Sequence, residues 1–417
     1  MTININVFLL FVFTVFLGYL GNLFYVKTKV PDVIWLLLFG FLIGPVFKLY
    51  DPEPFIRASS FMSIIALCII LFDAGINMDL DTFVKVFSRS LLLAFMYYFV
   101  NMIFVAAFLY SVFSGSLSFL NCLLLGAMLN TSPVTLSSLF HSLKFLNFDF
   151  KDVENTLLLE SVISTSLSFI CVITLIRLII SPGLSVVDSF RNIFLSFIFS
   201  MGFGSLSGCF WSFVLNKLRG QKFNYILTIA MVFLVYIVSE GVVESSGALT
   251  LLFFGLLLIN SDSIFRKLGF ERIFEVEISH LREFHEEITF LLKSFFFVYV
   301  GLITSISLNY LLTGLGASLM VLCSRLLVVR LYEYIVKLNV IESDIVKFSI
   351  ANGLSTLVVS RLPLLYDPNG LFIGDPALYN NVCFVVVIVS VLISMFLTPF
   401  VVSKDLKLMS KRANSNV

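Results

Sequence analysis

The sequence Asn130-Thr-Ser-Pro-Val-Thr135 decides the fold, because it places polar residues and a proline in the middle of the apolar stretch 117–140. A stretch of this length is long enough to cross a bilayer as a helix. Pro133 removes a backbone donor and clashes with the preceding turn, so we predict that the helix breaks there. The freed amides and carbonyls then need neighbours, water or an ion, although a simple kink healed by serine and threonine fits this segment equally well.

The composition of the whole chain is that of a polytopic membrane protein. Of 417 residues, 59% are hydrophobic and 13% are charged, and the mean hydropathy is +1.04. Soluble domains carry about 25% charged residues and need a polar surface, so soluble, disordered and disulfide-scaffold classes are excluded. The net charge of +1 says nothing about partners, and we expect no nucleic acid among them. The six cysteines form no CxxC pair or metal-ligand spacing, so we expect neither a cofactor nor a metal site.

Apolar stretches predict an all-α fold with about thirteen transmembrane helices. With the N-terminus placed outside, the predicted cytoplasmic loops and tail hold 20 lysines and arginines, and the outside loops hold three. This distribution predicts a multi-pass protein of the plasma membrane with an outside N-terminus and a cytoplasmic C-terminus. The predicted spans are 4–26, 31–49, 58–78, 90–113, 117–140, 156–179, 192–215, 223–242, 246–260, 287–308, 310–330, 347–366 and 378–402.

The chain is predicted to contain an inverted repeat. Gly40 in the second predicted span and Gly255 in the ninth lie in similar apolar motifs 215 residues apart, and Gly75 and Gly301 are separated by a similar distance. Seven helices separate the members of each pair, so they run in opposite directions, as in many secondary transporters. Chance likeness between leucine-rich helices is the alternative.

The repeat gives a predicted division of the chain. Residues 1–260 hold the first repeat (helices 1–6), a linker helix 7 and the start of the second repeat (helices 8–9). Residues 261–286 are expected to form an amphipathic connector, because charges alternate there with large apolar residues. Residues 287–403 hold the rest of the second repeat (helices 10–13), and 404–417 form a short basic cytoplasmic tail.

Polar residues at membrane depth are costly and therefore mark candidate sites. In span 156–179, helical spacing places Glu160, Ser161, Ser164, Thr165 and Ser168 on one stripe, which should face the bundle interior. An ionised carboxylate there needs a partner, and Arg325 in span 310–330 lies at a similar depth. We predict a buried Glu160–Arg325 pair, with a structural lock favoured over a role in transport.

Two further features lie in the second half of the chain. Under the repeat, the counterpart of the break at Pro133 is Asn352-Gly-Leu-Ser-Thr356, so two broken helices should face each other at the midplane. Lys293 and Arg361 also fall within predicted spans, and we expect their long side chains to reach the membrane interface.

Motifs along the chain resemble, in order, those of monovalent cation/proton antiporters. They are Pro31-Asp-Val…Gly40…Ile-Gly-Pro45, Ile70-Leu-Phe-Asp-Ala-Gly75, Ser245-Ser-Gly-Ala-Leu…Gly255, Phe296-Phe-Val-Tyr-Val-Gly301, Cys323-Ser-Arg325-Leu and Gly353-Leu-Ser-Thr356. The set is most similar to the NhaP-type sodium/proton antiporter family. The resemblance implies a six-helix core with broken helices 5 and 12, a dimerisation domain and a homodimer in the lipid bilayer. It also implies a transporter of a monovalent cation and a proton rather than an enzyme.

Both aspartates of the family motifs are replaced in this chain. The family's helix 5 motif, TDP, is Thr131-Ser132-Pro133 here, and its helix 6 motif, ES followed by ND, is Glu160-Ser161 followed by Ser164-Thr165. The arginine of the family's GLRG motif is Ser355. The family's glutamate–arginine pair, which is mainly structural, is retained as Glu160 and Arg325.

The replacements change the expected chemistry. Exchange in this family rests on a buried carboxylate that binds either a proton or a cation, whereas a hydroxyl neither titrates near neutrality nor carries charge. We therefore expect monovalent cation transport with altered or lost proton coupling. A carrier for an anion or neutral solute and a non-transporting antiporter homologue are the alternatives. The expected ion-path residues are Thr131, Ser132, Glu160, Ser161, Ser164, Thr165 and Ser355.

Overall fold

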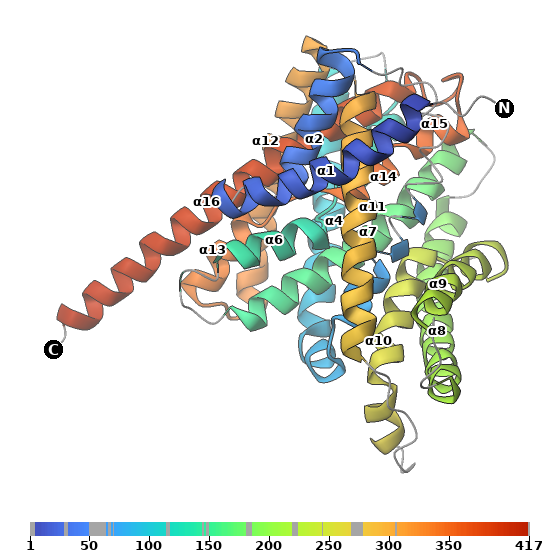
Figure 1. The fold of residues 1–417 in the computed structure, drawn as a ribbon. Coiled ribbons are helices and arrows are strands. Elements are labelled where there is room, and N and C mark those ends of the chain that lie inside the picture. Colours follow the sequence, from blue (N-terminus) through green and yellow to red (C-terminus); the bar gives the residue numbers. More distant parts are fainter. Residues whose placement is uncertain are drawn as a thin grey trace.

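The computed structural model describes residues 5–415, apart from 29–31, 50–63, 66–67, 70, 114–116, 144–145, 147–149, 181–185, 219–223, 244, 268–277 and 305–306. Every regular element within these residues is helical (Figure 1). A helical segment at 71–76 lies between η1 and α4. The labelled helices are α1 (Ile5–Thr28), α2 (Asp32–Phe41), η1 (Leu42–Val46), α4 (Leu80–Val112), α5 (Phe119–Met128), α6 (Pro133–Leu143), α7 (Lys151–Ile180), α8 (Val186–Lys217), α9 (Asn224–Gly241), α10 (Gly247–Lys267), α11 (Ile278–Ile303), α12 (Leu308–Ile335), α13 (Val340–Phe348), α14 (Leu354–Val359), α15 (Leu362–Tyr366) and α16 (Pro376–Ser415).

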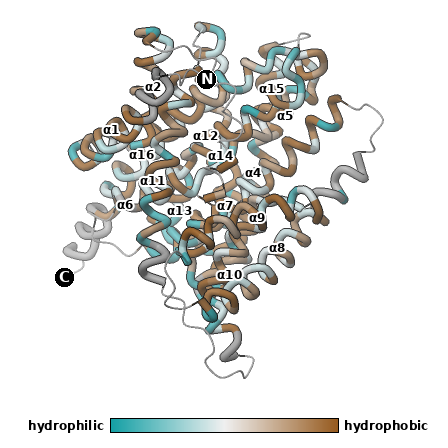
Figure 2. The backbone as a smooth tube through the Cα atoms, turned by 45° about the vertical axis from the view of Figure 1, so that its right-hand side comes forward, coloured by the Kyte–Doolittle hydropathy of each residue, from teal (hydrophilic) through white to brown (hydrophobic). Residues whose placement is uncertain are grey.

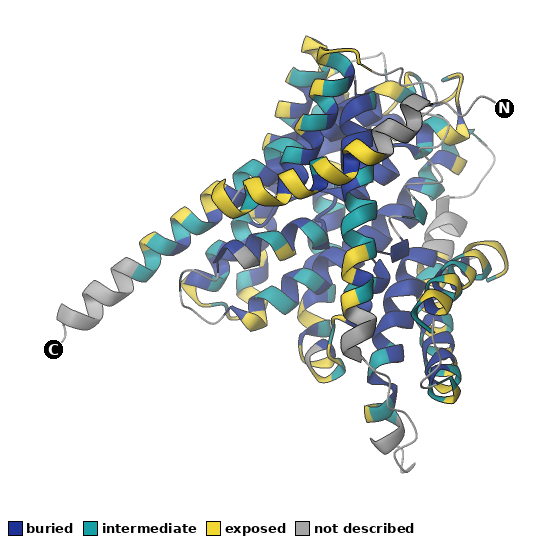
Figure 3. Cartoon of the chain, viewed as in Figure 1, coloured by how far each residue is buried: buried dark blue, intermediate teal, exposed yellow. Residues whose placement is uncertain are grey.

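The described helices are those of a multi-pass membrane protein. Seven are long and apolar enough to cross a bilayer, and there are eight when the bent pair α5–α6 is counted as one span. Hydrophobic residues run along the helices throughout the bundle (Figure 2). Large apolar side chains such as Phe16 on α1 and Phe210 on α8 point outward, whereas the central helices are buried (Figure 3). The all-α membrane fold is thus confirmed, and the count of thirteen spans stays a prediction.

The helices pack in two groups. In the first, called the core group, α4 contacts α5, α7 and α12, and α16 contacts α12 and α13. In the second, called the outer group, α11 contacts α1 and α2, and α10 contacts α8 and α9. The ring of Phe72 in segment 71–76 lies 4.8 Å from the ring of His285 on α11, which joins that segment to the outer group. Contacts of α7 with α8 and α10 connect the two groups.

Close glycine contacts within the outer group support the predicted repeat. A Cβ at Gly40 would overlap the backbone of α11 at Val298, and one at Gly301 would overlap the backbone of α2. Gly75 and Gly255 make the same kind of contact between segment 71–76 and α10. The offsets are 255 − 40 = 215 and 301 − 75 = 226 residues. When the first half of the chain is matched to the second, the Gly40–Gly301 contact therefore corresponds to the Gly255–Gly75 contact, as an inverted repeat requires.

The helix ends do not coincide with the predicted division of the chain, which stays a prediction. α10 continues to Lys267 and α11 begins at Ile278, so both helices extend into the predicted connector 261–286. The middle of that connector, 268–277, lies outside the described residues. α16 continues to Ser415 and extends beyond the bundle, so the described part of the basic tail, 404–415, prolongs the last helix (Figure 1).

Candidate functional site

Two broken helices cross at the centre of the core group. α5 ends at Met128 and α6 begins at Pro133, a residue suited to the first position of a helix because its missing amide proton would have no helical partner there. On the other side, α13 ends at Phe348 and α14 begins at Leu354. The Ser132 amide donates a 2.9 Å hydrogen bond to the Ala351 carbonyl and joins the two breaks directly. The predicted breaks in both helices are therefore confirmed, and a simple kink at Pro133 is excluded.

At each of the two breaks, an asparagine side chain makes the same hydrogen bond to the backbone. Asn130 Nδ2 donates to the Met128 carbonyl at 3.1 Å, and Asn352 Nδ2 donates to the Ile350 carbonyl at 3.0 Å. In each case the side-chain amide satisfies a carbonyl, two residues earlier, that the broken helix leaves without its usual partner. Equivalent residues at equivalent positions give the crossing the internal symmetry expected of the repeat.

Asn130 also accepts hydrogen bonds from residues of two other helices, α7 and α14. Its Oδ1 accepts hydrogen bonds from Ser355 at 2.6 Å and from Thr165 at 3.3 Å. Its backbone carbonyl accepts one from Thr356 at 3.2 Å. Asn130 was not among the expected ion-path residues. The feature that could have identified it is a buried side-chain amide within a predicted helix break. Through Asn130, the structure brings Thr165 and Ser355 together at the crossing.

Ser132 contributes a hydroxyl with no hydrogen-bond partner among the described residues. The residue is 1% exposed, and its Oγ faces Gly353, where an added Cβ would lie 2.7 Å from that oxygen. Close to Ser132, Thr165 Oγ1 lies 3.5 Å from the backbone carbonyl oxygen of Thr131, the residue before Ser132 in the chain. A buried hydroxyl without a partner costs free energy, so this oxygen is a strong candidate for contact with a bound ion or water.

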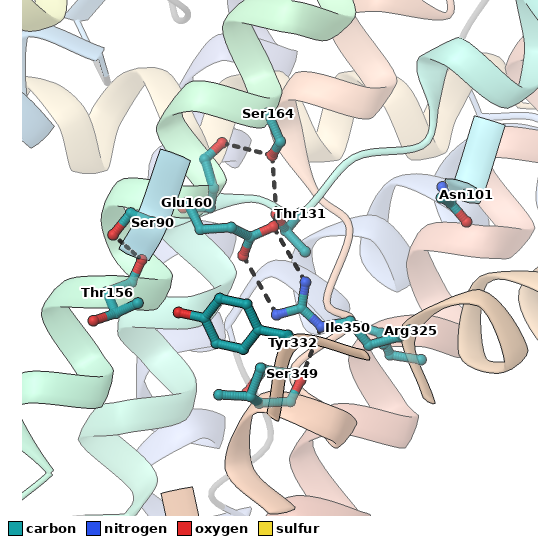
Figure 4. A network of polar contacts seen from close by, with 12 residues as sticks. Ser90, Asn101, Thr131, Thr156, Glu160, Ser164, Arg325, Tyr332, Ser349 and Ile350 are labelled. Carbon is teal, nitrogen blue, oxygen red and sulfur yellow. Dashed lines mark hydrogen bonds and ion pairs between the residues drawn. The ribbon is translucent and has the colours of Figure 1, made fainter. Parts of the chain in front are cut away.

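Glu160 of α7 faces Arg325 of α12 (Figure 4). Arg325 Nη1 and Nη2 donate to the two carboxylate oxygens at 3.2 and 3.4 Å, and both residues are 0% exposed. Arg325 Nε donates to the Val346 carbonyl near the end of α13 at 2.8 Å, and its guanidinium carbon lies 4.4 Å from the centre of the Tyr97 ring. All three nitrogens of the guanidinium are therefore engaged.

Hydroxyl groups connect this ion pair to the crossing. Thr131 Oγ1 donates to Glu160 Oε1 at 3.1 Å and lies 3.0 Å from Ser164 Oγ (Figure 4). Ser161 Oγ instead donates to the Leu158 carbonyl of its own helix at 2.7 Å. The structure thus brings Thr131, Glu160 and Ser164 together, while the hydroxyl of Ser161 bonds within α7.

The crossing offers neutral oxygen atoms and no titrating carboxylate of its own. Within the described ranges, the carboxylate in contact with it is that of Glu160, which is bound to Arg325. No group of three histidine, cysteine, aspartate or glutamate residues that could hold a metal ion occurs in this part of the chain. Unwound carbonyls and hydroxyls of this kind suit a dehydrated monovalent cation.

A cavity of about 420 Å³ lies between the two helix groups, toward the end of α7. Its wall includes Arg177 of α7 and Glu240 of α9. Glu240 Oε1 accepts a 2.8 Å hydrogen bond from the Gly247 amide at the start of α10. The cavity therefore lies at the boundary between the two helix groups.

Comparison with known proteins places these features in a family context. The family model described as "Sodium/hydrogen exchanger, transmembrane" matches residues 12–404. A structure of the sodium proton antiporter MjNhaP1 from Methanocaldococcus jannaschii at pH 8 has a TM-score of 0.75 and 18% identity, with 94% of each chain covered. A second MjNhaP1 structure, from an electron-microscopy map, has the same TM-score and identity with 96% of each chain covered. No curated protein sequence matches this chain.

Proposed function

Because the chain belongs to the sodium/hydrogen exchanger family, we propose that it is a secondary carrier of monovalent cations with altered or lost proton coupling. The observation that carries the proposal is the chemistry of the crossing. Its unpartnered oxygen is the Ser132 hydroxyl, and its neighbouring carboxylate, Glu160, is bound by Arg325.

The cation would be held by neutral oxygens. The break between α5 and α6 and the neighbouring helix α7 bring carbonyls and hydroxyls of Asn130, Thr131, Ser132 and Thr165 to one place. The C-terminal ends of α5 and α13 approach the crossing, and helix C-termini carry partial negative charge that stabilises a cation. Ser132 Oγ needs no rearrangement to act as a ligand, since no hydrogen bond has to be broken.

Proton coupling is disfavoured by the same geometry. A carrier that exchanges protons needs a group whose protonation competes with cation binding, and a serine or threonine hydroxyl does not titrate near neutrality. Glu160 could take that role only after separating from Arg325, and breaking a buried ion pair costs about 3–5 kcal/mol. On this proposal, cation binding at the crossing does not displace a proton from it.

The decisive experiment measures cation and proton flux in the same proteoliposomes. We expect uptake of Na⁺, K⁺ or Li⁺ down its gradient, with little accompanying change in internal pH. A Glu160→Gln variant is the control for coupling through the remaining carboxylate. A pH change of one proton per cation would overturn the loss of coupling, and no flux of any of the three cations would overturn cation transport.

A carrier for an anion or a neutral solute is the second candidate. The observation that favours it is the absence, among the described residues, of an unpaired carboxylate at the crossing. The N-termini of α6 and α14 also meet there and carry partial positive charge. Flux of a halide or a small carboxylate in the same vesicles, without cation flux, would replace the first proposal by this one.

We further propose that the carrier is a homodimer in the plasma membrane, with its N-terminus outside and its C-terminus in the cytoplasm. The distribution of basic residues, 20 against three, supports this orientation. Labelling of single cysteines introduced at each terminus tests the orientation, and cross-linking in native membranes tests the dimer. A labelled C-terminus on intact cells would contradict the orientation.

A further inference from the structure

The core group contains two buried arginines in contrasting environments. Arg325 has every guanidinium nitrogen bound, by Glu160 and by the Val346 carbonyl. Arg361, between α14 and α15, is 8% exposed, and its Nε and Nη2 have no hydrogen-bond partner among the described residues. It was expected to reach the membrane interface with its side chain, and this expectation is wrong because the side chain is buried.

No ion pair or ring contact relieves the charge of Arg361 within the described ranges. Tyr299 of α11 is the titratable group within electrostatic range of its guanidinium. An arginine stays protonated at all physiological pH values, so the charge cannot be lost by deprotonation. A buried cation of this kind is unfavourable unless a counter-charge accompanies it.

The identity of the two open nitrogens indicates which counter-charge fits. Nε and Nη2 lie on the same edge of the guanidinium, where their N–H bonds point in parallel. This edge matches the two oxygen atoms of a planar oxyanion, which it binds through two charge-assisted hydrogen bonds. A spherical anion offers one acceptor atom to both N–H groups, whereas a planar oxyanion offers one oxygen to each at the matching spacing, so the geometry favours a carboxylate-like group.

We propose that Arg361 binds a small planar oxyanion, of the carboxylate or bicarbonate class, where α14 and α15 of the core group face Tyr299 of α11. The site is distinct from the crossing, since Arg361 follows Ser355 by six residues, about 9 Å along a helix. It lies at a boundary between the helix groups. The bound anion therefore neutralises the charge of Arg361 on the side of the core group that is directed toward the outer group.

The test uses the full-length purified protein in detergent and does not depend on transport. Thermal unfolding is measured in sodium formate, acetate, nitrate or chloride, with methanesulfonate making up constant ionic strength. We expect formate and nitrate to raise the melting temperature saturably and at least tenfold more potently than chloride. Equal potency of formate and chloride would overturn the planar site, and no saturable effect of any of the ions would overturn the site altogether.

Variants of Arg361 complete the test. Arg361→Gln should abolish the saturable effect and be at least as stable as the wild type in methanesulfonate, because it removes an uncompensated charge. Arg361→Lys keeps the charge but lacks the parallel N–H edge, so its affinity for formate should fall at least tenfold. The control is Arg177→Gln, which removes an exposed arginine from α7 and should respond as the wild type does. Wild-type affinity in Arg361→Lys would overturn the proposal even if Arg361→Gln failed to fold.

Discussion

Removing one partner of the Glu160–Arg325 pair should cost far more stability than removing both. In Glu160→Gln, the 0% exposed Arg325 keeps its bond to Val346 and loses the carboxylate that accepts its other two bonds. Leaving one charge of a buried pair without its partner costs about 3–5 kcal/mol of unfolding free energy. Arg325→Gln should cost a similar amount, because the carboxylate then keeps the hydroxyl of Thr131 and has no cation beside it.

The double variant Glu160→Gln with Arg325→Gln removes both charges and leaves amides that can bond to each other. We expect it to be more stable than either single variant, which requires a coupling energy in the double-mutant cycle larger than the cost of one single variant, about 3 kcal/mol or more. Denaturant unfolding of the purified proteins, followed by tryptophan fluorescence, measures all four stabilities. Costs that add without coupling, or single variants within about 1 kcal/mol of the wild type, would refute the assignment of this pair as a structural lock.

Three further predictions follow from positions at the crossing and near the end of α15. Ser132→Ala deletes a buried hydroxyl that has no partner, so stability should change by less than about 1 kcal/mol while cation uptake falls severalfold; unchanged uptake would contradict its role as a ligand. Gly353→Ala places a methyl group 2.7 Å from Ser132 Oγ and should also lower uptake, whereas Gly202→Ala, with nothing within 4 Å of the added atom, is the matched control and should not. Burial alone would raise the pKa of Asp367. Hydrogen bonds from backbone amides, including those of residues 371–373, lower it by more, so the pKa lies below the ordinary value of 3.8. A carboxyl group whose pKa is lower in the folded than in the unfolded state adds stability above its unfolded pKa and loses it as pH falls through its folded pKa. The difference in melting temperature between wild type and Asp367→Asn should therefore shrink below about pH 3.8, and a difference that stayed constant from pH 7 to pH 3 would speak against this role.

Features set by local chemistry could be predicted from the sequence. The break at Pro133 follows from the missing amide proton and the clash of its ring, whatever surrounds it. The pairing of Glu160 with Arg325 followed from their equal depth in two predicted spans, because a charge at that depth needs a partner. The correspondence between the Gly40–Gly301 and Gly255–Gly75 contacts likewise rests on similar offsets along the chain, of 215 and 226 residues.

Features set by three-dimensional packing could not be predicted in this way. The role of Asn130 depends on Ser355 and Thr165, which approach it from segments 225 and 35 residues away. The burial of Arg361 depends on how neighbouring helices cover its side chain, and hydropathy along the chain contains no information about that cover. The ion pair of Lys293 with Asp32 at 2.6 Å likewise joins residues 261 positions apart in the chain.

The glycine contacts of the outer group leave no side-chain layer between α2 and α11, or between segment 71–76 and α10. Helices that touch backbone to backbone cannot slide past each other by a turn without steric overlap, so each pair behaves as a rigid unit. Any conformational change in a transport cycle is then concentrated at the boundary between these rigid helix pairs and the core group. Because the inverted repeat relates one helix pair to the other with opposite direction in the membrane, a rigid contact in one pair has a counterpart in the other.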